Sequence, residues 1–180
     1  MEGVLDYAIV PAGPGDAAEL GRVHVKSWRE TYPGLLPQAY LAAMRPQVHA
    51  RRFYRELIRA REGDAVLLAE GADGAVGYAA GVMLTGHGRA ADAEVHTLYV
   101  LREAQDAGLG RRLLTDTARV LAARGAVSLI IWVLRDNTYA RAFYEHLGGK
   151  LEAARVESVG GRVIPSVGYR WERLGGWLGA

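Results

Sequence analysis

The sequence of 180 residues contains no cysteine. Disulfide bonds, zinc sites with cysteine ligands and thiol nucleophiles are therefore excluded. The absence also suits a reducing compartment, so we expect a cytoplasmic protein.

Long apolar runs and a basic N-terminal segment are missing too. No apolar run reaches the ~18 residues that a membrane-spanning helix needs. The first residues, MEGVLDYAIVPAG, carry acidic side chains and no basic ones, which argues against a signal peptide. The sequence therefore predicts no membrane partner.

A strong charge of either sign is also absent, because 22 basic and 20 acidic residues leave a formal net charge of +2. Such a balance does not indicate nucleic-acid binding. The one basic cluster, RRFYRELIRAR at 51–61, sets its arginines opposite an apolar helical stripe, which is typical of a solvated helix face. The five histidines show no spacing typical of metal ligands. We expect neither a nucleic-acid partner nor a metal.

The apolar pattern that is present predicts one domain over residues 1–180. Helices are expected to begin near residues 16, 37, 46, 108 and 137, and in the first of them Asp16 and Glu19 fit a capping box. Strands are expected at 6–12, 65–70, 75–84, 91–101, 127–134, 150–158 and 162–172. This order predicts a mixed sheet with helices on both faces.

A glycine turn, EAQDAGLGRRLL at 103–114, follows the third of the central strands and opens a helix. It lacks the sixth-position glycine of a Rossmann fingerprint, which is Leu113 here, and the lysine of a Walker A loop. Free amides at the start of a helix, with the positive end of the helix dipole behind them, can hold an anion such as a pyrophosphate. A tight turn without any ligand explains the same residues.

Three blocks of sequence resemble the GNAT acetyltransferases, which move an acetyl group from acetyl-CoA to an amine. They are AEVHTLYVLREAQDAGLGRRLL, IIWVLRDNTYARAFYEHLGGK with its N-x-x-A-x-x-F-Y-x-x-L-G pattern, and, more loosely, HVKSWRETYPGLLP. The resemblance implies the acyl-CoA N-acyltransferase fold, an α+β arrangement whose mixed, mostly antiparallel central sheet is flanked by helices on both faces. It also implies acetyl-CoA as the co-substrate.

The resemblance further implies where acetyl-CoA binds. Its pantetheine arm is expected between the strands at 94–101 and 127–134. Its pyrophosphate is expected on the amides of the glycine turn, and Asn137 is expected beside the arm, with an ordinary helix cap as the simpler role of that side chain. The expected cofactor-binding residues are Leu98, Tyr99, Val100, Gln105, Asp106, Ala107, Gly108, Leu109, Gly110, Arg111 and Asn137.

The resemblance also assigns catalytic roles. Tyr144 matches the family position whose hydroxyl faces the departing sulfur, so it is the expected general acid, although a buried tyrosine bonded to the backbone fits the sequence as well. Glu94 is the leading candidate for the general base, with an exposed or ion-paired strand carboxylate as the alternative. Strand alternation places Glu94, His96, Leu98 and Val100 on one face. His96 has a suitable ordinary pKa but also fits a packed, hydrogen-bonded histidine.

The acceptor pocket is expected to include Trp28, Tyr32 and the loop from Pro33 to Pro37, with Glu30 attracting a protonated amine; Trp28 as a core residue is the alternative. His96 is a further candidate for contact with the acceptor. The expected function is acetyl transfer to a primary amine of a small molecule or peptide by direct attack, and the alternative is a non-catalytic module that binds acyl-CoA. Near the C-terminus, Trp177 either caps the sheet or joins a partner subunit in a homodimer.

Overall fold

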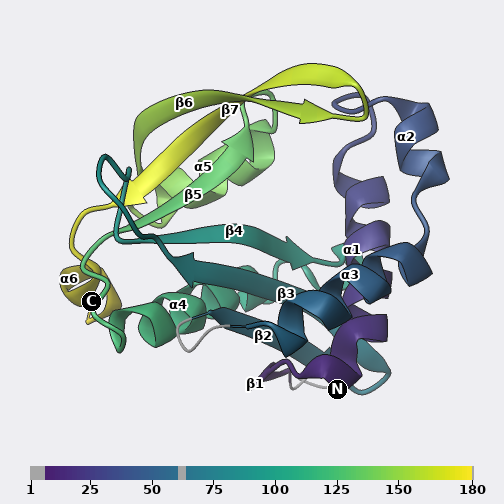
Figure 1. Ribbon diagram of the computed structural model, residues 1–180, viewed down its shortest axis with the longest axis horizontal. Coiled ribbons are helices and arrows are strands. Elements are labelled where there is room, and N and C mark those ends of the chain that lie inside the picture. The colour runs from purple at the N-terminus through teal and green to yellow at the C-terminus, as the bar shows by residue number, and fades with distance from the viewer. Residues whose placement is uncertain (1–6, 61–63, 180) are drawn as a thin grey trace.

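The computed structural model describes residues 7–60 and 64–179. Within them the chain forms a sheet and the helices that cover it (Figure 1). The strands are β1 (Ala8–Pro11), β2 (Ala65–Gly71), β3 (Gly74–Met83), β4 (Ala93–Val100), β5 (Leu129–Leu134), β6 (Lys150–Val159) and β7 (Arg162–Trp171). The helices are α1 (Ala17–Thr31), α2 (Gln38–Ala43), α3 (Pro46–Ile58), α4 (Leu109–Ala122), α5 (Thr138–His146) and α6 (Leu174–Leu178), with short 3₁₀ turns η1 (Pro14–Asp16) and η2 (Arg102–Ala104).

The sheet has seven strands in the order β1-β2-β3-β4-β5-β7-β6. Every neighbouring pair runs antiparallel except β4 and β5, which are parallel. A parallel pair needs a crossover connection, and α4 provides it. The mixed, mostly antiparallel sheet expected from the sequence is confirmed, and a strand is found at each of the seven expected places. Residue 6, where the first of them was expected to begin, lies outside the described residues.

The parallel pair separates along its length. Pairing between β4 and β5 runs only from Ala93 opposite Leu129 to Val95 opposite Ile131. Beyond these residues the two strands diverge, as Figure 1 shows between the labels β4 and β5. The remainder of β4 stays paired with β3 on its other side. The backbone edge of residues 97–100 that faces β5 therefore has no neighbouring strand within the part of the chain that the structure describes.

A β-bulge lies in β4 at His96. Opposite Ala80 stands Thr97, and opposite the next residue of β3, Gly81, stands Val95, so His96 is one residue extra. A bulge of this kind reverses the alternation of side chains beyond it. The expectation that Glu94, His96, Leu98 and Val100 share one face is therefore wrong.

The packing on the two faces of β4 agrees with this correction. Val95, which precedes the bulge, packs with residues of α4. Leu98 and Val100, which follow the bulge, pack on the same helix. Tyr99 packs instead with the cluster that α1 contributes on the opposite face. Glu94 alternates with Val95, so Glu94 lies on the face opposite to that of Leu98 and Val100.

Helices α1 and α3 cover one face of the sheet and α4 covers the other. Gly21 lets α1 and α3 cross closely, because a Cβ added there would lie 2.5 Å from the carbonyl oxygen of Pro46. Phe53 is the buried residue of the α3 stripe, whereas Tyr54 and Ile58, which share that stripe in the sequence, are exposed.

The expected capping box at the start of α1 is wrong. Asp16 accepts a hydrogen bond from the amide of Gly13, at 2.8 Å, and accepts none from the amides of α1. Glu19 pairs with Arg22 at 2.8 Å and accepts from the amide of Ala75 on β3 at 3.2 Å. These two carboxylates therefore fix a turn and a helix-to-sheet contact.

The C-terminal helix α6 packs against the sheet. In α6, Trp177 packs on Trp171 of β7 with ring centroids 5.1 Å apart, so this side chain has its partner within its own chain. None of the helices in the described ranges is long and apolar enough to cross a membrane.

Candidate active site

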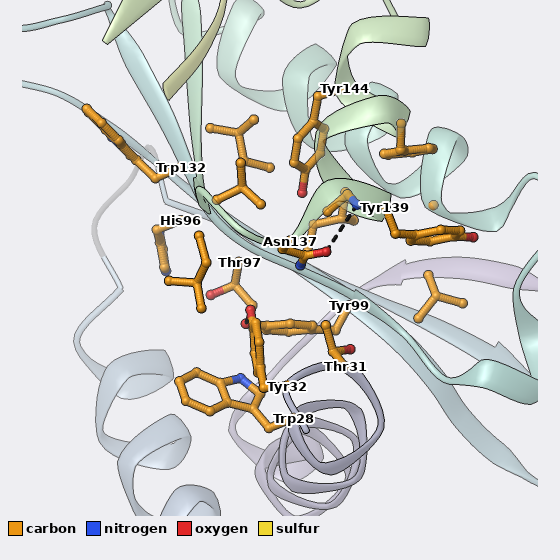
Figure 2. Close-up of a pocket in the computed structure, with 18 of the residues that line it drawn as sticks. Trp28, Thr31, Tyr32, His96, Thr97, Tyr99, Trp132, Asn137, Tyr139 and Tyr144 are labelled. Atoms are coloured by element: carbon orange, nitrogen blue, oxygen red, sulfur yellow. Dashed lines mark hydrogen bonds between the residues drawn. The ribbon is translucent and has the colours of Figure 1, made fainter. Parts of the chain in front are cut away.

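A cavity of about 360 Å³ occupies the gap between β4 and β5 (Figure 2). Its walls come from segments far apart in the sequence: the two diverging strands, the turn before α4, the start of α5, the end of α1 and the β6–β7 hairpin. The cavity exists because the sheet splits here, and it joins the glycine turn at one end to an aromatic-lined chamber at the other.

The glycine turn presents free backbone amides to this cavity. Asp106 and Gly108 both adopt left-handed backbone, with φ of 64° and 71°. No side chain caps the start of α4. In the described part of the chain no atom accepts a hydrogen bond from the amides of Asp106 to Arg111. A row of unsatisfied donors at a helix N-terminus fits a pyrophosphate, as P-loops and Rossmann turns show.

The two glycines of the turn, Gly108 and Gly110, are favoured for different reasons. At Gly108 an added Cβ would meet no atom within 4 Å, so glycine is favoured there by its positive φ. At Gly110 an added Cβ would lie 3.4 Å from Phe143, so this position brings α4 against α5. The Gln105 side chain fixes the turn to β4 by donating to the carbonyl of Val100 at 2.9 Å. Ala107 is exposed and is not part of the cavity wall.

The β4 wall consists of His96, Thr97, Leu98, Tyr99 and Val100. Because this strand has no neighbour on the β5 side, part of its backbone donors and acceptors are free for an extended ligand. The residues expected to hold a pantetheine arm are thus at the edge where an arm can add like another strand.

Tyr144 lies in α5 with its ring buried and its hydroxyl pointing into the cavity (Figure 2). Among the described residues the hydroxyl has no hydrogen-bond partner, so the alternative of a backbone-bonded tyrosine is not what the structure shows. Burial raises the pKa of Tyr144, which keeps the phenol protonated and able to donate. Asn137, on the same wall, caps α5 by accepting from the amide of Ala140 at 3.2 Å.

The two base candidates differ in position. His96 lines the cavity, whereas Glu94 is not among its lining residues. The His96 side chain is exposed and lines both this cavity and a second hollow beside α3. Desolvation by the surrounding atoms lowers its pKa below 6.5, while the nearby Glu94 carboxylate opposes the shift. The lowered pKa leaves His96 neutral near pH 7, which is the form that accepts a proton.

On the acceptor side, Trp28 of α1 and Tyr32, which directly follows α1, both line the cavity, together with Leu36 of the following loop. The Tyr32 hydroxyl is bonded to that of Tyr99 at 2.8 Å, which joins α1 to β4. Burial raises the pKa of Tyr32. Glu30 is not a lining residue, because its carboxylate accepts from the amide of Arg102 at 2.9 Å and fastens η2 to α1.

Several lining residues are missing from the expectations, and among them are Trp132 of β5 and Arg155 and Glu157 of β6. The Arg155 guanidinium lies 4.1 Å from the centroid of the Trp132 ring and pairs with Glu157 at 2.9 Å. They reach the cavity through the strand order β5-β7-β6, which no local pattern in the sequence reveals.

Comparison with known proteins shows which family the chain belongs to. The model of the acetyltransferase (GNAT) family matches residues 25–149. An uncharacterized N-acetyltransferase, YuaI of Bacillus subtilis, is 28% identical over 88% of this chain and 89% of its own. A spermidine N(1)-acetyltransferase of Thermoplasma acidophilum is 25% identical over 76% of this chain and 84% of its own.

Among solved structures, PaiA N-acetyltransferase from Thermoplasma acidophilum in complex with coenzyme A superposes with a TM-score of 0.72 at 21% identity, covering 90% of this chain and 98% of that one. The chain belongs to the GNAT acetyltransferase family. It is accordingly an acetyltransferase with acetyl-CoA as its co-substrate.

Proposed function

We propose that the protein, acting as one domain, transfers the acetyl group of acetyl-CoA directly to a primary amine of a small molecule or peptide. The observation that carries the proposal is the Tyr144 hydroxyl, which points into the cavity between the diverging strands and has no hydrogen-bond partner in residues 7–60 and 64–179. The ring is buried but the hydroxyl faces the cavity, and no internal hydrogen bond holds it, so it is available to donate to a bound substrate.

In this proposal the free amides of Asp106 to Arg111 hold the pyrophosphate, and the unpaired edge of Leu98 to Val100 holds the pantetheine arm. Both groups of atoms lie along the same cavity as Tyr144. The thioester would then lie where β4 and β5 separate. Asn137, whose Oδ1 is used by the α5 cap, still has its amide nitrogen to donate.

The reaction needs one proton removed and one supplied. The neutral amine attacks the thioester carbonyl, forming the C–N bond, and the C–S bond breaks to release the thiolate. His96 takes the proton from the amine nitrogen, and the Tyr144 hydroxyl donates to the sulfur as it leaves. We propose His96 ahead of Glu94 as the base because His96 lines the cavity, and we assign to Glu94 a supporting charge near the imidazole.

The acceptor is a primary amine that fits between Trp28, Tyr32 and Trp132, beside the Arg155–Glu157 pair. Aromatic faces attract ammonium groups, and Glu157 offers a carboxylate that an ammonium group would share with Arg155. The name of the spermidine N(1)-acetyltransferase makes a polyamine the first acceptor to try. Amino acids, aminoglycosides and peptide N-termini follow.

The test is thiol release from acetyl-CoA, followed with a thiol reagent against a panel of these amines. The chain contains no cysteine, so every thiol detected comes from coenzyme A. Tyr144→Phe is expected to lower turnover by about 10²–10⁴-fold while acetyl-CoA binding stays intact.

Tyr169→Phe is the matched control, because its ring lies 5.9 Å from that of Tyr144. The Tyr169 hydroxyl is bonded to Arg141 and Glu145, so its loss is expected to lower stability and leave turnover nearly unchanged. Parental turnover in Tyr144→Phe would reject Tyr144 as the acid. Acetyl-CoA binding without thiol release for any amine would favour the non-catalytic module.

A further inference from the structure

Strand β6 forms one edge of the sheet, and its only strand partner among the described residues is β7. In Figure 1 it lies along the outer rim of the molecule. The strand is ten residues long, and its outer edge carries unpaired backbone groups. Long exposed edges of this kind are templates for pairing with another strand.

The residues of the β6–β7 hairpin divide between two faces. A bulge at Glu152 interrupts β6, and from Ala153 to Val159 the strand is regular. Val156 is 68% exposed and Val163 73% exposed, and both lie on the face opposite to the cavity. Arg155 and Glu157 lie on the cavity face. The regular half of the strand is therefore an apolar centre flanked by one positive and one negative side chain.

This order of charges is complementary to itself. Two copies of β6 can pair antiparallel about a two-fold axis perpendicular to the sheet, with one residue placed opposite its own copy. If the residue on the axis, called the centre here, is Arg155 or Glu157, like charges face each other, which is destabilising. A centre at Ala154 sets Val156 against the bulged Glu152.

A centre at Val156 avoids all of these conflicts. Val156 then faces the partner's Val156, and Arg155 faces the partner's Glu157 on both sides of the axis. The seven residues from 153 to 159 pair without meeting the bulge. β-Branched pairs and opposite charges are the cross-strand contacts that stabilise a sheet.

We propose that the protein forms a symmetric dimer through β6, with Val156 on the two-fold axis. The sheets of the two copies then continue into each other. Arg155 and Glu157 also line the cavity, so the dimer brings charged side chains of both copies to the acceptor end of each cavity. The proposal stands on the edge, the exposed valine and the charge order, and it does not depend on the acetyl acceptor.

Charge reversal tests the register. In R155E, positions 155 and 157 are both acidic, and in E157R they are both basic. In a dimer of either variant these two positions would face the same charges in the partner. Each variant alone is therefore expected to remain a monomer of 19.5 kDa in sedimentation velocity. An equal mixture of the two variants is expected to restore the dimer, because acidic pairs then face basic pairs. K150E is the control, since it makes the same charge reversal as R155E outside the paired segment.

A dimer that survives in R155E or E157R alone, or a mixture that stays monomeric, would overturn the proposal, as would a parent chain that is monomeric at every concentration. A thiol cross-link gives a second readout, because the chain contains no cysteine of its own. Val156→Cys is expected to form a disulfide-linked dimer on mild oxidation, whereas Val163→Cys, equally exposed but off the axis, is expected to form far less. The reverse pattern would contradict a centre at Val156.

Discussion

The buried imidazole of His24 should make the stability of this protein depend on pH. His24 lies in α1 beneath the acceptor chamber, only 7% exposed, with Nδ1 2.7 Å from the hydroxyl of Tyr78. Burial, aided by the nearby His49 and Arg52, lowers the pKa of His24 from 6.5 to about 3. The folded state therefore holds this side chain neutral where the unfolded chain protonates it.

The sign and size follow from these two pKa values. Between pH 6.5 and pH 3 the unfolded chain binds the extra proton, so the free energy of unfolding falls as the pH is lowered. At pH 5 protonation stabilises the unfolded chain by about 2.1 kcal/mol, against about 0.2 kcal/mol at pH 7. His24 alone should therefore remove about 1.9 kcal/mol of stability between pH 7 and pH 5. For a chain of this size that equals roughly 4–8 °C in melting temperature.

The assay is urea unfolding at both pH values for the parent and for His24→Gln, which has no titrating group at this position. Other acid-sensitive groups, including His49, are present in both proteins, so the difference between their pH dependences isolates His24. His87→Gln makes the same substitution on an exposed loop and controls for the loss of an imidazole as such. An equal loss of stability in the parent and in His24→Gln would refute the reasoning.

Two further predictions concern the candidate site. Gly108→Ala is expected to cost about 1–2 kcal/mol of stability, because Gly108 has a positive φ, and also to weaken coenzyme A binding. Gly125→Ala is the control, since Gly125, just after α4, has φ of 97° and equally open surroundings. This variant should lose similar stability in a thermal melt and bind coenzyme A as the parent does. If both variants bind coenzyme A like the parent, the turn is not its site. The acidic limb of the kcat/KM profile should reflect a pKa below 6.5 and should vanish in His96→Gln; a limb that persists there would assign it to another group.

Much of the fold could be predicted because its signals are local. The Asn137 cap, the apolar stripe of α4 and the two-sided burial of β5 each depend on residues near one another in the chain. Short turns with glycines separate β2 from β3 and β6 from β7, and the bounds of the strands are close to the expected ones. The carboxylates of Asp16 and Glu19 misled the prediction because a preceding turn and a distant strand compete for them.

The site was only half visible in the sequence. The turn from Gln105 to Arg111 and the position of Tyr144 belong to local motifs, and both lie on the cavity. The bulge at His96 depends on pairing with β3, so alternation alone placed Leu98 on the wrong face. Trp132 and Arg155 come together only because β7 inserts between their strands.

The central claim is that the free amides after β4 and the open edge of β4 hold coenzyme A in line with Tyr144. A titration of ¹⁵N-labelled protein with coenzyme A, followed by amide chemical shifts, tests it most directly. The largest changes are expected at residues 106–111 and 97–100, with smaller ones at Asn137 and Tyr144. Saturable binding that leaves the amides of 106–111 unmoved would contradict it.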